Sequence, residues 1–220
     1  MSVATTDYLA AIAHLPAGAA LRMDDVTWEE YEQLLADLGD GYAVRIFYDQ
    51  GRMEIVAPTS IHERPKGIIN TLLYVLSDEL DIDVEGFGST TFREKLKAKG
   101  AEPDECFYVQ NASAVIGKEE EIDLRYDPPP DIVVEVDRTS ASLNKFNIYS
   151  ALGVPEIWRI KGGSLEIHLL AENNYEQSPT SRAFPSLSAQ TLMEFMTKGL
   201  VEGERKTARA FRDWVREHYR

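Results

Sequence analysis

Three acidic residues interrupt a short apolar segment near the middle of the chain, which reads DPPPDIVVEVDRTS over residues 127–140. A run of Val and Ile bounded by prolines predicts a β-strand that is buried on both faces. Because side chains alternate along a strand, Asp131, Glu135 and Asp137 share one face. A buried carboxylate is costly unless a cation or a hydrogen-bond donor lies beside it. Glu135, inside the run, is therefore either misplaced or kept there for chemistry.

A second acid offers Glu135 a partner. Asp131 lies about 13 Å from Glu135 along a strand, too far for both to bind one metal ion, and we expect it to mark the strand entry. Asp104 follows a proline in EPDECFYV and begins another apolar strand, 31 residues before Glu135. Two adjacent strands could bring Asp104 and Glu135 together around Mg²⁺, which prefers one or two carboxylates plus water and phosphate oxygens.

The elements that must position these acids begin with a helix. Thr27 and Glu30 form the signature of a capping box, and they predict a helix over residues 27–38. A hairpin is expected around the turn at 49–52, and apolar spacing predicts a long amphipathic helix over 62–80.

The second half of the chain alternates strands and helices. Strands are expected over 83–92, 104–110, 131–137, 154–160 and 164–170, and helices over 140–152, 187–199 and 205–220. The strand at 131–137, the helix that Gly153 ends and the next strand predict a βαβ unit.

Composition is typical of a globular protein with one domain. No apolar run approaches the roughly 20 residues of a membrane-spanning helix, and the first residues lack the basic region of a secretory signal. We therefore expect a soluble cytoplasmic protein. The single cysteine, Cys106, lies in a strand-like segment, where a buried reduced thiol is favoured over a nucleophile.

The net charge of −14 and the pI near 4.7 argue against broad binding to a phosphate backbone. Two segments are locally basic: residues 92–100 carry four bases against one acid, and residues 205–220 carry six against two. For the second segment a solvated helix face is favoured. For the first, a solvated loop and a nucleic-acid contact through Arg93, Lys95 and Lys97 are equally supported.

The segments EPDECFYVQN and PPPDIVVEVDRTSASLNKFNIYSALGVPEIWRI together resemble the putative restriction endonuclease family of the PD-(D/E)XK nuclease superfamily. The resemblance implies a restriction-endonuclease-like α/β core, with a mixed central sheet flanked by helices, over residues 27–200. Residues 1–26 are then an N-terminal extension, and residues 201–220 form a basic helix that packs on or extends the domain. By this resemblance, Asp104 matches the first motif acid and Glu135 the second.

One position departs from the superfamily pattern, because Asp137 stands where a lysine is expected. The resemblance implies that this lysine has moved to the following helix, where Lys145 fits. A cation near the attacking water or the scissile phosphate can act from either element. Asp137 is then a strand-end cap or a third metal acid, with the cap favoured. Superfamily members often carry an acid on the first core helix, and Glu63 either takes that catalytic place or only complements the helix dipole.

The resemblance implies a metal-dependent endonuclease that hydrolyses phosphodiester bonds of nucleic acid, with DNA as the expected substrate. Asp104 and Glu135 would bind Mg²⁺ or Mn²⁺, and Lys145 would stabilise the developing charge. Two alternatives stay open. The displaced lysine also fits a degenerate nuclease fold that acts as a binding or regulatory module. Paired carboxylates could serve glycoside hydrolysis, but the apolar strands fit an open sugar-binding cleft poorly.

A homodimer is the expected assembly. The family resemblance implies it, and the C-terminal segments hold more apolar residues than one short helix needs for its own packing. These residues include Leu192, Phe195 and Met196.

Overall fold

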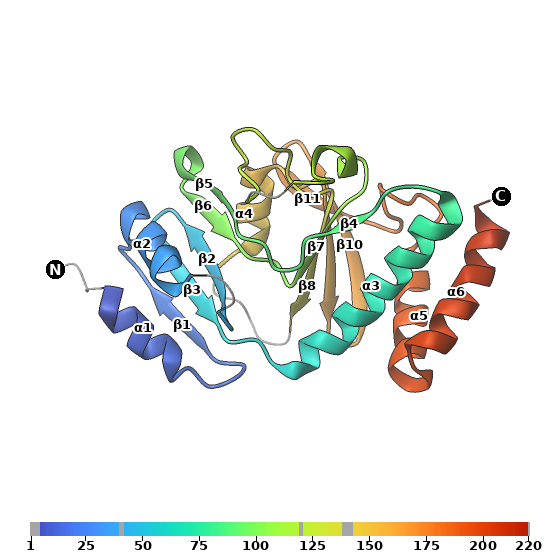
Figure 1. Ribbon diagram of the computed structural model, residues 1–220, viewed down its shortest axis with the longest axis horizontal. Coiled ribbons are helices and arrows are strands. Elements are labelled where there is room, and N and C mark those ends of the chain that lie inside the picture. The colour runs from blue at the N-terminus through green and yellow to red at the C-terminus, as the bar shows by residue number, and fades with distance from the viewer. Residues whose placement is uncertain (1–4, 40–41, 119–120, 138–142, 220) are drawn as a thin grey trace.

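A computed structural model describes residues 5–39, 42–118, 121–137 and 143–219, and two β-sheets with helices around them form the described part of the chain (Figure 1). The first sheet has the strand order β1-β3-β2-β6-β5, with bounds Ala20–Met23, Arg52–Val56, Arg45–Asp49, Lys99–Ala101 and Phe92–Glu94. The second has the order β11-β10-β9-β8-β7-β4, with bounds Asn174–Ser178, Ser164–Ala171, Glu156–Lys161, Ile132–Asp137, Glu105–Tyr108 and Glu85–Gly86. The second sheet is mixed, so the predicted α/β core is confirmed.

Five of the described helices follow the predicted order, and the first was not predicted. The helices are α1 Thr5–Ala13, α2 Trp28–Leu38, α3 Ser60–Leu80, α4 Lys145–Leu152, α5 Ala189–Glu202 and α6 Glu204–His218, with short 3-10 turns at Lys95–Lys97 and Ala112–Ala114. The predicted capping box begins α2, because the Glu30 amide donates to Thr27 Oγ1 at 3.2 Å and the Thr27 amide donates to the Glu30 carboxylate at 2.8 Å.

The mixed sheet contains the predicted βαβ unit. Strand β8 runs parallel to β9 and connects to it through α4, while β7 pairs with β8 in the antiparallel sense. Figure 1 shows α3, α5 and α6 on one side of this sheet and α4 with the first sheet on the other. The α4 side of β8 is therefore enclosed between two sheets.

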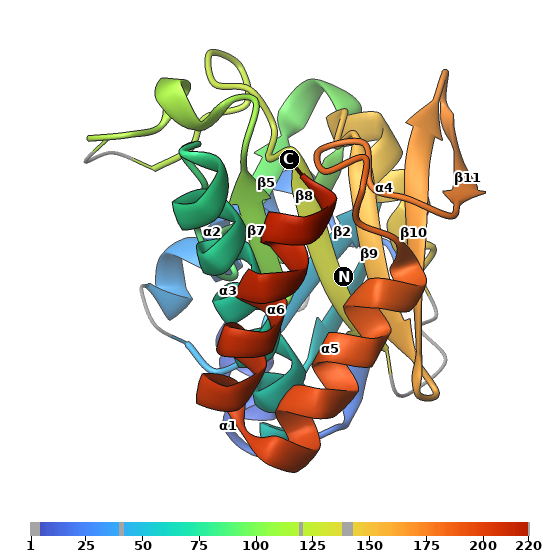
Figure 2. The same ribbon diagram turned by 90° about the vertical axis from the view of Figure 1, so that its right-hand side faces the viewer.

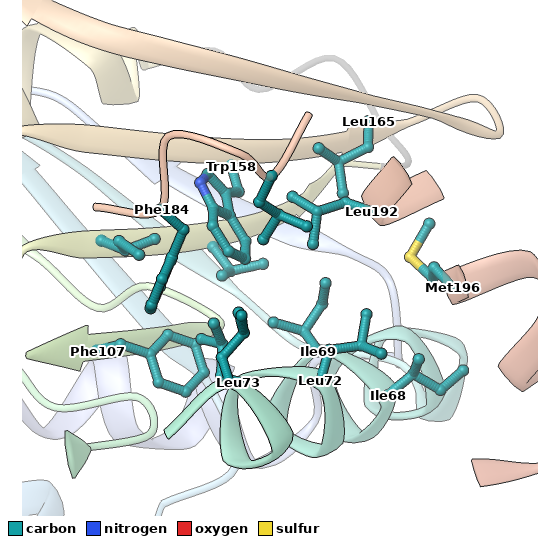
Figure 3. Packing of buried hydrophobic residues seen from close by; sticks show 14 of the residues in the cluster. Ile68, Ile69, Leu72, Leu73, Phe107, Trp158, Leu165, Phe184, Leu192 and Met196 are labelled. Atoms are coloured by element: carbon teal, nitrogen blue, oxygen red, sulfur yellow. The ribbon is translucent and has the colours of Figure 1, made fainter. Parts of the chain in front are cut away.

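The two faces of the mixed sheet carry separate cores. On the α3 side, Ile69 and Leu72 of the helix pack toward Trp158 and Phe184 (Figure 3). On the α4 side, Val133 is buried in a second cluster. The predicted buried thiol, Cys106, belongs to this second cluster, and burial raises its pKa well above the usual range. The thiol is therefore not an activated nucleophile.

Residues 83–92 do not form the single strand that the sequence predicts. They divide into β4 and the start of β5, which belong to different sheets. The chain turns between them at Gly88, whose φ of +60° suits a residue without a Cβ. Strands β1, β6 and β11 were not predicted. Helix α4 begins at Lys145, later than the predicted start, and residues 138–142 lie outside the described part of the chain.

The C-terminal helices lie side by side against the α3 side of the mixed sheet (Figure 2). Leu192 and Met196 are buried, and the Phe195 ring packs on Phe211 at 4.8 Å between centroids. The apolar residues that favoured a homodimer are thus used within the chain, and the homodimer stays a prediction. In the described ranges, no helix is long and apolar enough to cross a membrane.

The basic residues of the C-terminal helix α6 form ion pairs within the chain. Arg212 Nη1 lies 2.8 Å from Asp78, and Arg216 Nε lies 2.6 Å from Glu79, so α6 is ion-paired to α3. This agrees with the interpretation of the tail as a helix face rather than as a nucleic-acid contact. At the other end, β1 pairs with β3, which places part of residues 1–26 in the first sheet.

Candidate active site

The α4 face of β8 presents a buried carboxylate. Glu135 lies inside the strand and is 2% exposed, and Asp104, 8% exposed, directly precedes the neighbouring strand β7. Asp104 Oδ2 accepts a hydrogen bond of 2.8 Å from the amide of Val136, the residue after Glu135. Asp104, at the start of β7, therefore lies beside the segment of β8 that carries Glu135.

Lys145, the first residue of α4, contacts the same carboxylate. Its Nζ lies 2.5 Å from Glu135 Oε2, a charge-assisted hydrogen bond in a largely buried setting. The ammonium also lies 4.2 Å from the centroid of the Phe47 ring, which β2 of the first sheet contributes. The predicted proximity of Lys145 to Glu135 is thus present, and the lysine comes from the helix after the strand, as the resemblance implied.

Burial sets the electrostatics of this cluster. Burial raises the pKa of Glu135 to about 7; Lys145 opposes the rise, and the nearby Asp104 charge adds to it. Burial alone would lower the pKa of Lys145, but the surrounding carboxylates outweigh it, and the pKa is raised. Lys145 therefore stays a cation across the neutral range, while Glu135 exchanges its proton within it.

Asp137 is ion-paired instead of forming a simple cap. Its carboxylate lies 2.7 Å from Arg159 Nε of the neighbouring strand β9 and 3.9 Å from Lys145 Nζ. The Arg159 partner was not foreseen, because only the parallel register of β8 and β9 places it opposite the acidic strand. Asp131 ends up where the sequence predicted, at the strand entry, and accepts hydrogen bonds from the amides of Val109 and Asn111.

Tyr149 is a site residue that the sequence reasoning missed. Its hydroxyl donates a short hydrogen bond to Glu135 Oε1, so both carboxylate oxygens have protein donors. The signal was available, because residues four apart on a helix share a face, and Tyr149 is four residues after Lys145.

Tyr149→Phe is expected to weaken divalent-metal binding at pH 7 about tenfold, since it removes a hydrogen bond to a buried charge and raises the pKa of Glu135 further. Titration calorimetry measures the affinity. Tyr175→Phe is the matched control, because the Tyr175 hydroxyl donates to the backbone oxygen of Val154. Equal effects of the two variants would contradict a role of Tyr149 at the site.

Glu63 does not join this cluster. It is exposed in the first turn of α3, where Lys66 lies 3.8 Å from it, and α3 covers the opposite side of the mixed sheet from α4 (Figure 1). The geometry agrees with the helix-dipole interpretation. Glu105 is a buried acid on the α3 side of the sheet, and it accepts a hydrogen bond of 2.9 Å from Asn70 of α3.

The predicted nucleic-acid cations lie on the β5–β6 hairpin and its turn. Arg93 lies 3.0 Å from Glu32, and Lys95 lies 3.0 Å from Glu29, so α2 neutralises both. Lys97 is exposed at the turn. The locally basic segment is therefore not a free cationic patch, and its contact with nucleic acid stays a prediction.

A family model with the description "Putative restriction endonuclease" matches residues 28–198. The chain belongs to this family. The matched range contains both acids, Lys145 and Tyr149. A solved structure described as a putative nuclease belonging to DUF820, from Anabaena variabilis ATCC 29413, is similar over 78% of this chain and 99% of its own. Its TM-score is 0.50 and its sequence identity 17%, so the similarity shows a shared fold. No curated protein matches the chain.

The donor set of this candidate site suits a hard cation. Among the residues that the structure describes, no group of three His, Cys, Asp or Glu side chains forms a complete metal cluster. Two carboxylates from adjacent strands are nevertheless what Mg²⁺ commonly takes from a protein, because water and phosphate oxygens supply the remaining ligands. Asp104 and Glu135 therefore fit a metal ion whose remaining ligands are water and phosphate oxygens.

Proposed function

We propose that this chain is a metal-dependent endonuclease that hydrolyses phosphodiester bonds of nucleic acid, with DNA as its substrate. Family membership supports a nuclease. The observation that carries the proposed metal-dependent mechanism is the contact of 2.5 Å between Lys145 Nζ and Glu135 Oε2. Asp104, at the start of the adjacent strand, lies beside this pair. Two acids and one lysine in a buried cluster are the groups that such chemistry needs.

Asp104 and Glu135 would hold Mg²⁺ or Mn²⁺. When bound, the ion polarises the phosphoryl oxygen and makes a bound water more acidic. The hydrogen bond from the Val136 amide fixes the Asp104 carboxylate, and Tyr149 fixes that of Glu135. The protein thus orients both ligands through the strand and through α4.

Lys145 would act on the charge that develops at the phosphate. Its ammonium sits between a carboxylate and an aromatic ring, where water is largely excluded. A fixed charge in such a site stabilises a transition state more than a solvated one does, because no solvent must reorganise. Asp104 and Glu135 would hold the cation, and the Lys145 ammonium would donate to a phosphate oxygen of the substrate.

A binding or regulatory module without turnover is the second candidate. It is favoured by the closed state of the cluster, in which Lys145 and Tyr149 already occupy both oxygens of Glu135. A metal ion at Glu135 must share these oxygens with the two donors or displace one of them.

Incubation of supercoiled plasmid with the purified chain tests the proposal. Nicking is expected with Mg²⁺ or Mn²⁺, is expected to stop with a chelator, and should return when metal is restored, since the acids alone cannot activate water. Asp104→Asn is the isosteric control for a contaminating nuclease. Metal binding by calorimetry without any nicking would support the module instead, and chelator-resistant nicking would contradict metal dependence.

A further inference from the structure

One row of the first sheet faces the candidate site. Arg22 of β1, Glu54 of β3 and Phe47 of β2 are direct cross-strand neighbours, so their side chains share a face. Phe47 is buried in the core cluster of the α4 side, and its ring lies beneath the Lys145 ammonium. The first sheet therefore supplies part of the wall of the site.

Glu54 is a buried carboxylate in this row that the proposed chemistry does not use. It is 1% exposed. Its Oε1 lies 3.1 Å from Arg22 Nε, and its Oε2 accepts a hydrogen bond of 3.3 Å from the amide of Leu143. One oxygen thus contacts the sheet, and the other contacts the segment that leads into α4.

The start of α4 depends on such a contact. Lys145 is the first helical residue, and the side chain of the N-cap residue, Asn144, makes no capping hydrogen bond. Leu143 is buried, and its amide is held by a side chain more than 80 residues away in sequence. Any movement of Leu143 moves Lys145, two residues later, relative to Glu135.

We propose that Glu54 is a positioning residue, which holds the first turn of α4 through the Leu143 amide and so keeps the Lys145 ammonium against Glu135. The hydrogen bond from the Leu143 amide to Glu54 supports this positioning. Its consequence for catalysis rests on the proposed nuclease function. A misplacement of a reacting group by about 1 Å can cost roughly 100-fold in rate, so a positioning contact outside the site can affect turnover strongly.

Glu54→Gln tests the inference, because an amide has one acceptor oxygen and cannot serve both Arg22 and the Leu143 amide. Glu156→Gln is the matched control. Glu156 is equally buried on a strand and accepts hydrogen bonds from the amides of Arg182 and Ala183, away from the site.

Two readouts separate the geometry from the chemistry. The side-chain resonances of Lys145, measured by NMR in lysine-labelled protein and assigned against Lys145→Met, report the position of the ammonium without any substrate. Steady-state cleavage reports its consequence. Glu54→Gln is expected to shift the Lys145 resonances, to lower kcat roughly 10-fold to 100-fold and to leave KM nearly unchanged. Glu156→Gln is expected to change none of these.

Unchanged Lys145 resonances in folded Glu54→Gln, or equal shifts in Glu156→Gln, would overturn the inference. If wild type does not cleave but Glu54→Gln still shifts Lys145 selectively, the positioning inference holds and the nuclease proposal fails. Glu54→Asp keeps the buried charge beside Arg22 and withdraws it from Leu143 by one methylene. It is therefore the second variant if Glu54→Gln does not fold, and it is expected to shift Lys145 in the same way.

Discussion

Lys145→Met is expected to lower cleavage roughly 100-fold to 1,000-fold, because it removes the only positive charge that directly contacts Glu135 in the described structure. The fold is expected to survive. Removal of one partner from a buried ion pair is usually costly, but Glu135 has a pKa of about 7 and can take up a proton instead. The Tyr149 hydroxyl also stays beside it. Metal affinity should stay nearly unchanged, because loss of the ammonium raises the pKa of Glu135 but also removes a positive charge that repels an incoming metal ion.

Plasmid nicking with circular dichroism and metal titration on the same sample measures this prediction. Lys145→Arg is expected to restore little, because a planar guanidinium cannot occupy the place of a compact ammonium. Lys198→Met is the control, as Lys198 is a surface lysine paired with Glu202 at 2.9 Å. Cleavage by Lys145→Met at the wild-type rate would show that the lysine has no catalytic role and would favour the binding-module interpretation.

The parts of the site that could be predicted are close in sequence. Glu135, Lys145 and Tyr149 lie within one strand–helix connection, and a strand followed by a helix that packs on it brings such residues together. Asp104 could be predicted because an acid beside a proline at the start of an apolar strand is unusual. These inferences need only local periodicity and adjacency of two strands.

The parts that could not be predicted come from the first sheet. Glu54 and Phe47 alternate with apolar residues in a hairpin, and nothing in that pattern shows which face meets α4. Their role follows from the packing of the first sheet against the start of α4, and these contacts join residues far apart in sequence. Arg159 was hidden for the same reason, because the parallel register of β8 and β9 places it opposite Glu135, from where its side chain reaches Asp137 two residues along the strand.

The sequence gives the net charge of the chain directly, but it does not show which charged residues stay unpaired on the surface. The basic segment at 92–100 does not form a separate cationic patch. Acids from α2 and from β2 pair with it; for example, Lys99 forms an ion pair with the buried Asp49. Local counts along a sequence cannot include partners that tertiary folding supplies.

Glu135→Gln is expected to lower metal-dependent cleavage on the order of 1,000-fold, because an uncharged amide replaces a ligand that contributes several kcal/mol of charge stabilisation. The loss should appear in metal titration as well as in plasmid nicking. Glu156→Gln again serves as the buried control. Wild-type metal affinity in Glu135→Gln would rule out Glu135 as a ligand.

The pH dependence of metal binding gives the sharper test of Glu135. Because its pKa is about 7, a proton competes with the metal below that pH, and the affinity of wild type should fall about tenfold for each pH unit further down. Titrations in buffers with different heats of ionisation should therefore show about one proton released per metal bound near pH 6 and almost none near pH 8. Glu135→Gln should show neither the slope nor the release.

The same pKa fixes the sign of a stability effect. Between about pH 4.5 and 7 the folded metal-free protein holds the Glu135 proton more tightly than the unfolded chain does, so this contribution to stability is complete below the window and is lost as pH rises through it. Thermal unfolding should show wild type losing stability relative to Glu135→Gln across this window, and added Mg²⁺ should offset the loss above it. A difference between the two proteins that stays constant from pH 4.5 to 8 would mean that Glu135 is ionised throughout and that Lys145, rather than burial, dominates its environment.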